Sequence, residues 1–288
     1  MQRKLHPLEG IVAAFALFIA LALTIGFAQA DEIKKQKAVF LRSSSALVLD
    51  AATGEAVIDK NSDAVVPIAS ITKLMTAMVI LDRGLDLETR IVLSRDDIRT
   101  IKRSRTRLRT GASLTRDELL MLSLMASENL AAAALGRTYP GGMEAFVEAM
   151  NAKAEALGMS DTRFVEPTGL SPQNVSSARD LAQLVRAANN YPLIREYSTR
   201  ERGTVQVFKR PLSFGNTNRL VRSSQWDIDL SKTGYISQAG RCLVMRVRLA
   251  SKDLIVVLLD SWGRQSRIGD ANRIRKWLES NLSSARSS

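Results

Sequence analysis

Cysteine and histidine are almost absent from this 288-residue chain, and each absence excludes a class of site. The single cysteine, Cys242, rules out an intramolecular disulfide. The single histidine, His6, lies within the first ten residues. Aromatic residues make up only 5% of the chain, so aliphatic residues and methionine must fill most of the core. With 45% apolar and 24% charged residues, the composition is that of a folded globular protein.

Residues 1–30 have the pattern of a secretory signal peptide. Two basic residues near the start precede an apolar run over 11–27, and Ala28-Gln29-Ala30 gives the small-x-small sequence that signal peptidase cleaves. The alternative is a retained membrane anchor, although such a run spans only about 25 Å as a helix, short of the ~30 Å hydrocarbon core. We predict an exported, periplasmic protein with a single domain over 31–288.

Cleavage of this segment would leave a mature chain without any histidine. A Ser-His-Asp triad, a Cys-His pair and a histidine-based zinc site are then excluded. An enzyme made from this chain must activate its nucleophile with a base other than imidazole. We expect neither a metal nor an organic cofactor.

The formal net charge of +12 suggests an anionic partner. Export argues against nucleic acid and favours a polyanionic cell wall or an anionic membrane surface, with peripheral association. The densest basic cluster lies within 99–109 and comprises Arg99, Lys102, Arg103, Arg105, Arg107 and Arg109. Such a cluster is typical of a solvated face or of a loop held by local ion pairs, and it identifies no ligand by itself.

Apolar periodicity predicts strands at both ends of the mature chain and helices between them. The expected strands cover 46–50, 55–59, 204–209, 232–236, 242–249 and 254–259, and the expected helices cover 70–82, 119–125, 145–157, 178–189 and 270–282. A capping box, Thr115 to Glu118, precedes the second helix. The predicted class is α+β, with an antiparallel sheet lobe (31–69 and 200–288), a helical lobe (about 70–199) and a cleft between them.

Ser70-Ile-Thr-Lys73 provides a nucleophile and a base that need no histidine. Three residues apart at the start of a buried helix, the two side chains lie on one side within hydrogen-bond reach. Burial should lower the pKa of the lysine, so that a neutral amine could accept the serine proton. Alone, the pattern occurs by chance in many helices.

Two further triplets strengthen this interpretation. Ser127-Glu-Asn129 follows a helical stretch, and Lys232-Thr-Gly234 begins a strand. A second serine beside a lysine can relay a proton to a leaving amine, and the lysine can also attract a substrate carboxylate. Gly234 would let a substrate backbone pair closely with the strand.

With these three motifs, the chain resembles the serine penicillin-binding proteins and β-lactamases. It is most similar to the small D-alanyl-D-alanine peptidases, and within them to the endopeptidase subgroup. No residues remain after the closing helix for the extra C-terminal β-domain of the carboxypeptidase relatives, which also favours that subgroup. The stretches that resemble the subgroup are Phe164-Val-Glu-Pro-Thr-Gly-Leu-Ser171, Ser177-Ala-Arg-Asp180, Asn216-Thr-Asn218, Trp226-Asp227 and Lys232-Thr-Gly-Tyr235.

The resemblance implies a β-lactamase/transpeptidase-like fold and a role for each motif residue. Ser70 would form the acyl-enzyme, Lys73 would be its general base, and Ser127 would relay the proton. The backbone N–H groups of Ser70 and Tyr235 would form the oxyanion hole. The implied substrate-binding residues are Asn129, Lys232, Thr233, Gly234 and Tyr235.

The implied substrate is the D-alanyl peptide of peptidoglycan, cut at D-alanyl–diaminopimelate cross-links, and β-lactam antibiotics would trap the serine covalently. The alternatives are a D-Ala-D-Ala carboxypeptidase, a class A-like β-lactamase, and a penicillin-binding or wall-associated protein without turnover. A class A β-lactamase needs a loop glutamate followed four residues later by asparagine, whereas Glu166 is followed by Leu170. We therefore expect a structural role for Glu166. Cys242, Trp262 and Trp277 are interpreted as packing residues.

Overall fold

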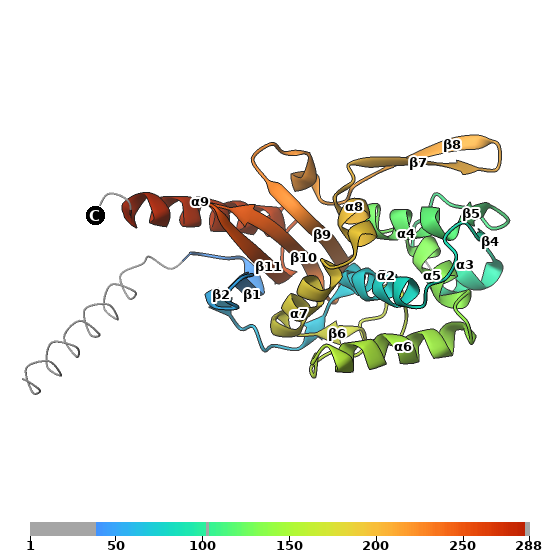
Figure 1. Cartoon of the computed structure of the whole chain (residues 1–288), viewed down its shortest axis with the longest axis horizontal. Coiled ribbons are helices and arrows are strands. Elements are labelled where there is room, and N and C mark those ends of the chain that lie inside the picture. Colours follow the sequence, from blue (N-terminus) through green and yellow to red (C-terminus); the bar gives the residue numbers. More distant parts are fainter. Residues whose placement is uncertain (1–38, 102–103, 286–288) are drawn as a thin grey trace, which may run out of the picture.

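A computed structural model describes residues 39–101 and 104–285. The expected signal peptide, residues 1–30, lies outside them. A five-stranded antiparallel sheet forms one half of the molecule, with the strand order β2-β1-β11-β10-β9 (Figure 1). Its strands are β1 (Ser43–Asp50), β2 (Ala56–Lys60), β9 (Asp227–Ile236), β10 (Gly240–Leu249) and β11 (Lys252–Ser261). The first and last strands thus share one sheet, as the sequence predicted.

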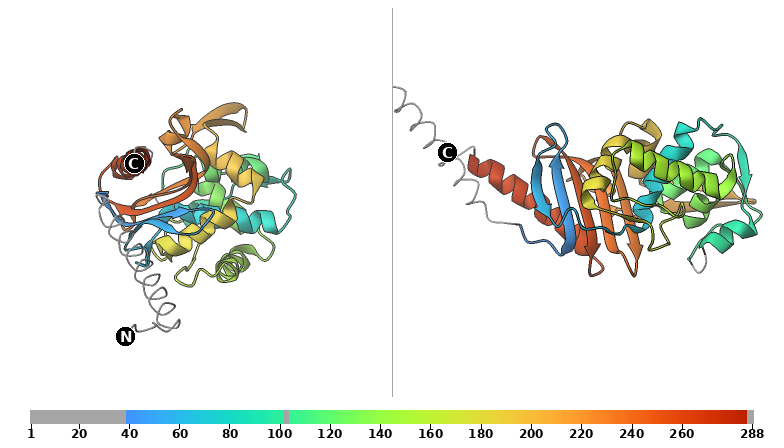
Figure 2. Two further views of the ribbon diagram at one scale, coloured as in Figure 1. Left: turned by 60° about the vertical axis from the view of Figure 1, so that its left-hand side comes forward. Right: turned by 90° about the horizontal axis from the view of Figure 1, so that it is seen from below.

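Both faces of this sheet are covered, which explains why the middle of β11, from Leu254 to Leu259, is apolar throughout. Along β11, Leu254, Val256 and Leu258 belong to the core under α9 (Ser266–Ala285). The alternate residues Ile255, Val257 and Leu259 belong to the core on the opposite face. Successive side chains of a strand point to opposite faces, so the strand contributes to both cores. Figure 2 shows α9 alone on one face and the remaining helices on the other.

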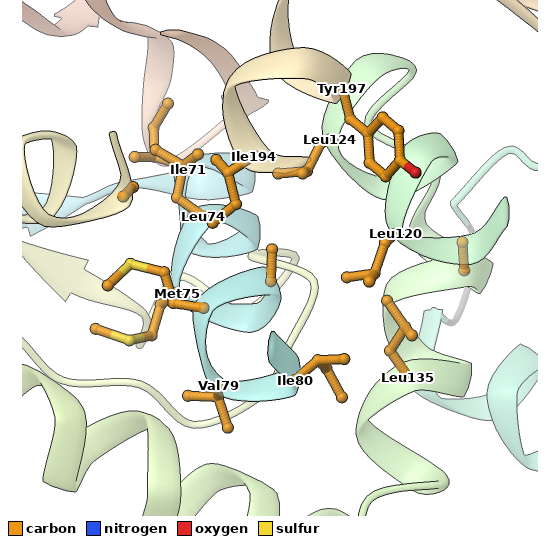
Figure 3. Close-up of a cluster of buried hydrophobic side chains, with 14 of the residues drawn as sticks. Ile71, Leu74, Met75, Val79, Ile80, Leu120, Leu124, Leu135, Ile194 and Tyr197 are labelled. Atoms are coloured by element: carbon orange, nitrogen blue, oxygen red, sulfur yellow. The ribbon is translucent and has the colours of Figure 1, made fainter. Parts of the chain in front are cut away.

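The second half of the molecule is helical, and α2 (Thr72–Asp82) runs through its centre. Figure 3 shows Ile71, Leu74 and Ile80 meeting side chains from three other helices, α4, α5 and α8. The other helices are α3 (Arg95–Ile101), α4 (Arg116–Met125), α5 (Asn129–Arg137), α6 (Gly142–Ala156), α7 (Ala178–Ala188) and α8 (Pro192–Thr199). Although α7 falls in the range expected for the helical lobe, it packs against β1, β10 and β11.

Short strands and turns complete the chain. They are β3 (Val66–Pro67), β4 (Arg90–Val92), β5 (Ser113–Thr115), β6 (Val175–Ser176), β7 (Arg202–Val207), β8 (Arg210–Gly215), and the 3-10 turns η1 (Ala69–Ile71) and η2 (Arg219–Arg222). The capping box before α4 is confirmed, because Thr115 Oγ1 accepts from Glu118 N and Glu118 Oε2 accepts from Thr115 N.

One predicted strand, 204–209, is wrong at its end. β7 stops at Val207, and a two-residue turn leads into β8, which the sequence pattern did not predict. Proline disfavours the interior of a strand, but the hairpin of β7 and β8 has only two strands and therefore has free edges, where the missing N–H of Pro211 is tolerated.

The packing roles of two residues are confirmed and that of a third is wrong. Cys242 is fully buried in β10, and burial raises the pKa of its thiol to about 11, so it stays protonated. Trp277 packs partly buried against the core under α9. Trp262 is 69% exposed, because it follows the last residue of β11 and extends beyond the sheet. Among the described residues, no helix is both long and apolar enough to cross a membrane.

Asp270 ties the closing helix to the first strand. Its carboxylate is fully buried and accepts from Arg42 N at 2.9 Å, Ser43 N at 2.8 Å and Ser43 Oγ at 2.6 Å. Loss of this carboxylate would remove the acceptor of both N–H groups, and buried donors without an acceptor are costly.

We predict that Asp270→Ala lowers the free energy of unfolding by about 3 kcal/mol, because it leaves several buried donors unpaired. Urea unfolding measures the change. Glu279→Ala, an exposed acid on the same helix, is the control and should change stability by less than about 0.5 kcal/mol. Equal losses in the two variants would contradict the structural role of Asp270.

Candidate active site

Ser70 and Lys73 meet where η1 passes into α2. The sequence predicted one helix from residue 70, but Ser70 lies in the 3-10 turn that precedes α2. Lys73 Nζ donates a hydrogen bond to Ser70 Oγ at 3.0 Å. The predicted pairing of the hydroxyl with the amine is therefore present.

The amine of Lys73 is fully buried and uses three acceptors. Besides Ser70, it donates to Asn129 Oδ1 at 2.7 Å and to the carbonyl of Thr168 at 2.5 Å. Burial lowers the pKa of Lys73 to about 8, although Glu166 and Glu128 oppose this shift with their charges. An appreciable fraction of the amine is therefore neutral near physiological pH, as a proton acceptor requires.

A second serine–lysine pair faces the first. Lys232 of β9 is buried, and its Nζ donates to Ser127 Oγ at 2.8 Å and to the Thr233 carbonyl at 3.1 Å. Burial, with repulsion from Lys73 and Arg267, lowers the pKa of Lys232 well below its usual range. Two ammonium groups in one buried site are thus disfavoured, and the pair can accept and pass on a proton.

Ser127 occupies the break between α4 and α5 in a strained conformation. Its φ of +58° is left-handed, which costs an L-residue about 1–2 kcal/mol. Strain of this kind concentrates at functional sites. Here it turns the chain between the two helices, so that Ser127 reaches Lys232 while Asn129, at the start of α5, reaches Lys73.

The loop that precedes β5 supports this break from outside. Ser104 Oγ accepts from Asn129 Nδ2 at 2.5 Å, and Thr106 Oγ1 donates to Glu128 Oε1 at 2.6 Å. Burial raises the pKa of the Glu128 carboxyl, while the bond from Thr106 opposes this shift. Sequence reasoning missed both loop residues, since nothing in a basic, irregular segment marks them.

The loop around Glu166 positions the Thr168 carbonyl oxygen so that it accepts a hydrogen bond from Lys73. The carboxylate of Glu166 accepts from Thr168 N at 2.7 Å, Gly169 N at 2.6 Å and Asn174 Nδ2 at 3.1 Å, and Thr168 Oγ1 donates to it as well. The structural role predicted for Glu166 is confirmed by these contacts.

Two glycines allow other backbone segments to reach the turn that carries Ser70. A Cβ on Gly169 would lie 2.0 Å from the Ala69 carbonyl oxygen, and one on Gly234 would lie 2.9 Å from the Ile68 carbonyl oxygen. The sequence interpretation assigned Gly234 to close approach by a substrate. In the structure, the space beside it is filled by the protein's own turn.

The end of β9 carries further polar groups beside the buried pair. Thr233 Oγ1 shares a 2.6 Å hydrogen bond with Thr217 Oγ1, and Tyr235 is 55% exposed beneath the guanidinium of Arg241. Arg267 donates to the Gly234 carbonyl at 2.7 Å, and burial lowers its pKa to about 10. Thr217 and Arg267 were missed as neighbours of the site, although Thr217 lies in a stretch already noted for its resemblance.

The structure therefore brings the predicted residues into two connected groups. Ser70, Lys73 and Asn129 form one, and Ser127, Lys232 and Thr233 form the other. Asn129 and Ser127 belong to the same turn between helices, which joins the two groups. Hydroxyls paired with buried amines of lowered pKa are suited to acyl transfer through serine.

Comparison with known proteins agrees with this chemistry. The family model for D-alanyl-D-alanine carboxypeptidase, peptidase S11, matches residues 32–263. The chain belongs to this family. It is therefore a serine-type D-Ala-D-Ala hydrolase by descent, as the three motifs predicted.

This S11 peptidase is similar in sequence to two endopeptidases and in structure to a transpeptidase. It is 49% identical over 242 residues to a D-alanyl-D-alanine endopeptidase of Pseudomonas aeruginosa, which covers 83% of this chain and 78% of that one. It is 44% identical over 276 residues to a D-alanyl-D-alanine endopeptidase of Escherichia coli, which covers 93% and 88%. The Streptomyces K15 DD-transpeptidase superposes with a TM-score of 0.77 at 26% identity, over 84% of this chain and 98% of that one. The predicted fold is confirmed.

We predict that Gly169→Ala destabilises this S11 peptidase by about 3 kcal/mol, since it adds a clash to left-handed strain. Gly158→Ala is the matched control: its φ of +70° resembles the +79° of Gly169, but no atom lies within 4 Å of the added Cβ. The control should lose about 1 kcal/mol. Urea unfolding compares them, and equal losses would show that the contact with Ala69 is unimportant.

Proposed function

We propose that this protein is a periplasmic peptidoglycan endopeptidase that hydrolyses D-alanyl–diaminopimelate cross-links through an acyl-serine at Ser70. The observation that carries the proposal is the 3.0 Å contact between Lys73 Nζ and Ser70 Oγ, with the amine buried and its pKa lowered to about 8. Such an amine can take the hydroxyl proton as Ser70 attacks the D-alanyl carbonyl.

The second pair supplies the next proton transfer. As the tetrahedral intermediate collapses, the C–N bond breaks and the leaving amine needs a proton. Ser127 Oγ can deliver it, because Lys232 holds that oxygen at 2.8 Å and can replenish its proton. Water then attacks the acyl-serine, which releases the D-alanyl carboxylate and restores Ser70.

The remaining residues position the substrate. The backbone N–H groups of Ser70 and Tyr235 would bind the oxyanion, a kind of contact typically worth a factor of about 10²–10³ in rate. Asn129 would hold a substrate peptide group, and Thr233 a carboxylate beside the scissile bond. When it is protonated, Lys232 adds positive charge at that end, which suits a substrate rich in carboxylates.

Endopeptidase action is favoured over its alternatives by two observations. Both relatives compared above are named endopeptidases, although the family description names carboxypeptidases. A rapid β-lactamase is disfavoured because the carboxylate of Glu166 is engaged by the loop's own donors, and Leu170 stands where such enzymes have asparagine.

Intact-mass measurement with benzylpenicillin tests the nucleophile. We expect a persistent adduct on the protein and none on Ser70→Ala, with Ser224→Ala, an exposed serine, as a control that is acylated normally. With purified cross-linked muropeptide dimer, the protein should yield monomers and Ser70→Ala should not.

Three other results would each reject part of the proposal. A penicillin adduct that forms and vanishes within seconds would indicate a β-lactamase. Release of terminal D-alanine from monomers, with intact dimers, would indicate a carboxypeptidase. Acylation without turnover of either substrate would indicate a binding protein.

The pH dependence of acylation tests the base. Because the pKa of Lys73 is lowered to about 8, the neutral fraction should increase about tenfold between pH 7 and pH 9 and then level off. The second-order rate of benzylpenicillin acylation should follow this curve. Lys73→Arg keeps the charge but not a titratable base, and should remove both the rate and its pH dependence. A rate that is flat from pH 6 to 9 would exclude Lys73 as the base.

A further inference from the structure

A basic pocket lies between two segments that are about a hundred residues apart in the sequence. One is the loop at the end of the basic cluster, and the other is the tip of the β7–β8 hairpin, which extends along the helical half in Figure 1. The pocket has a volume of about 820 Å³, and its lining includes Thr106, Arg107, Arg109, Phe208, Lys209 and Arg210.

The charges in this pocket all have one sign. The loop contributes Arg107 and Arg109, and the hairpin contributes Lys209 and Arg210. No described acidic residue lines the pocket. Arg109, Lys209 and Arg210 are exposed, and no described residue forms an ion pair or side-chain hydrogen bond with them. Converging like charges repel one another, and an anion in the pocket would offset that repulsion.

The basic cluster therefore does more than form local ion pairs. Arg99 does so with Asp96 at 2.9 Å, as expected for a solvated face. Arg107 instead donates to the Ser213 carbonyl of β8 at 2.6 Å and lies over the ring of Phe214. It fixes the loop to the hairpin, so the two walls of the pocket have a defined spacing.

Phe208 at the hairpin tip adds an apolar surface to this pocket. It is 61% exposed and has a left-handed φ of +56°. Two-residue hairpin turns ordinarily place glycine or asparagine at such a position. An exposed aromatic ring that is kept in a strained turn, beside four cations, is a feature of a ligand surface rather than of a core.

Both walls continue directly into the catalytic groups. Thr106 lines the pocket and donates to Glu128, the residue between Ser127 and Asn129. On the other side, β8 ends at Gly215, two residues before Thr217, which is bonded to Thr233. A chain bound between Asn129 and Thr233 can therefore follow the hairpin to the pocket.

We propose that this pocket is an anion subsite, which holds carboxylates of the peptide strand beyond the scissile cross-link. The inference rests on the proposed function. Six strand residues extend about 20 Å, so a substrate must be long and extended to reach from Thr233 to the hairpin tip. A cross-linked peptide dimer has that length and carries several carboxylates, whereas benzylpenicillin is too short. The pocket thus selects for cross-linked substrate.

Steady-state kinetics with purified muropeptide dimer test the subsite. The double variant Arg109→Ala/Arg210→Ala should raise KM for the dimer about five- to tenfold, because it removes two charged contacts. The rate of benzylpenicillin acylation, which reports on the catalytic groups alone, should stay at the wild-type value. Added salt should raise the wild-type KM more than that of the variant.

The control variant removes the same charge elsewhere. Arg83→Ala/Arg195→Ala alters two exposed arginines that do not line the pocket, and KM should stay unchanged. An unchanged KM in the pocket variant, or an equal rise in the control, would overturn the subsite. So would a parallel loss of penicillin acylation, which would indicate a distorted active site.

A binding measurement separates this proposal from the proposed function. Calorimetry with the dimer and Ser70→Ala measures affinity whether or not the wild-type protein cleaves the dimer. The subsite requires a Kd about five- to tenfold weaker when the two pocket arginines are also replaced. Equal affinity, together with loss of binding to vesicles of anionic phospholipid, would assign the pocket to a membrane surface and overturn the proposal.

Discussion

Burial of the Lys73 amine is the constraint on which the site depends. An ammonium deprived of water is unfavourable unless polar groups surround it, and Lys73 has three such acceptors. These acceptors come from η1, from the start of α5 and from the loop after Glu166. Three segments separated by up to about a hundred residues must therefore be held in place around one nitrogen.

Much of the surrounding structure can be understood as meeting this requirement. Glu166 binds the backbone of its own loop, which aims the Thr168 carbonyl at Lys73. Ser127 has a left-handed backbone conformation at the break between α4 and α5. This conformation places Asn129, at the start of α5, within hydrogen-bond distance of Lys73. Gly234 leaves room for the turn that carries Ser70 against β9. Each of these arrangements lowers the stability of the fold locally, and the well-packed cores on both faces of the sheet offset that loss.

The sequence predicted the elements with strong periodicity and missed those that depend on contacts. α2 and the central strands have long apolar segments, so their positions were predicted closely. β8 was missed because it is formed by pairing with β7, and the short segment from Arg210 to Gly215, with Pro211 in it, has little strand pattern of its own. Ser104, Thr106, Thr217 and Arg267 were missed because their partners lie far away in the chain. Trp262 was misassigned because burial of a single aromatic residue cannot be judged from its neighbours in sequence.

By itself, the sequence predicted catalysis without imidazole, because its one histidine, His6, lies in the expected signal peptide, and it identified the serines and lysines available for that chemistry. Ser70 and Lys73 follow from local spacing, and Ser127 and Lys232 from short motifs that resemble those of a known family; neither requires knowledge of distant contacts. Only the tertiary structure decided the pKa of Lys73, the pairing of Ser127 with Lys232 and the meeting of the basic loop with the hairpin. The reason is that desolvation and charge repulsion depend on distances between segments, and folding alone sets those distances.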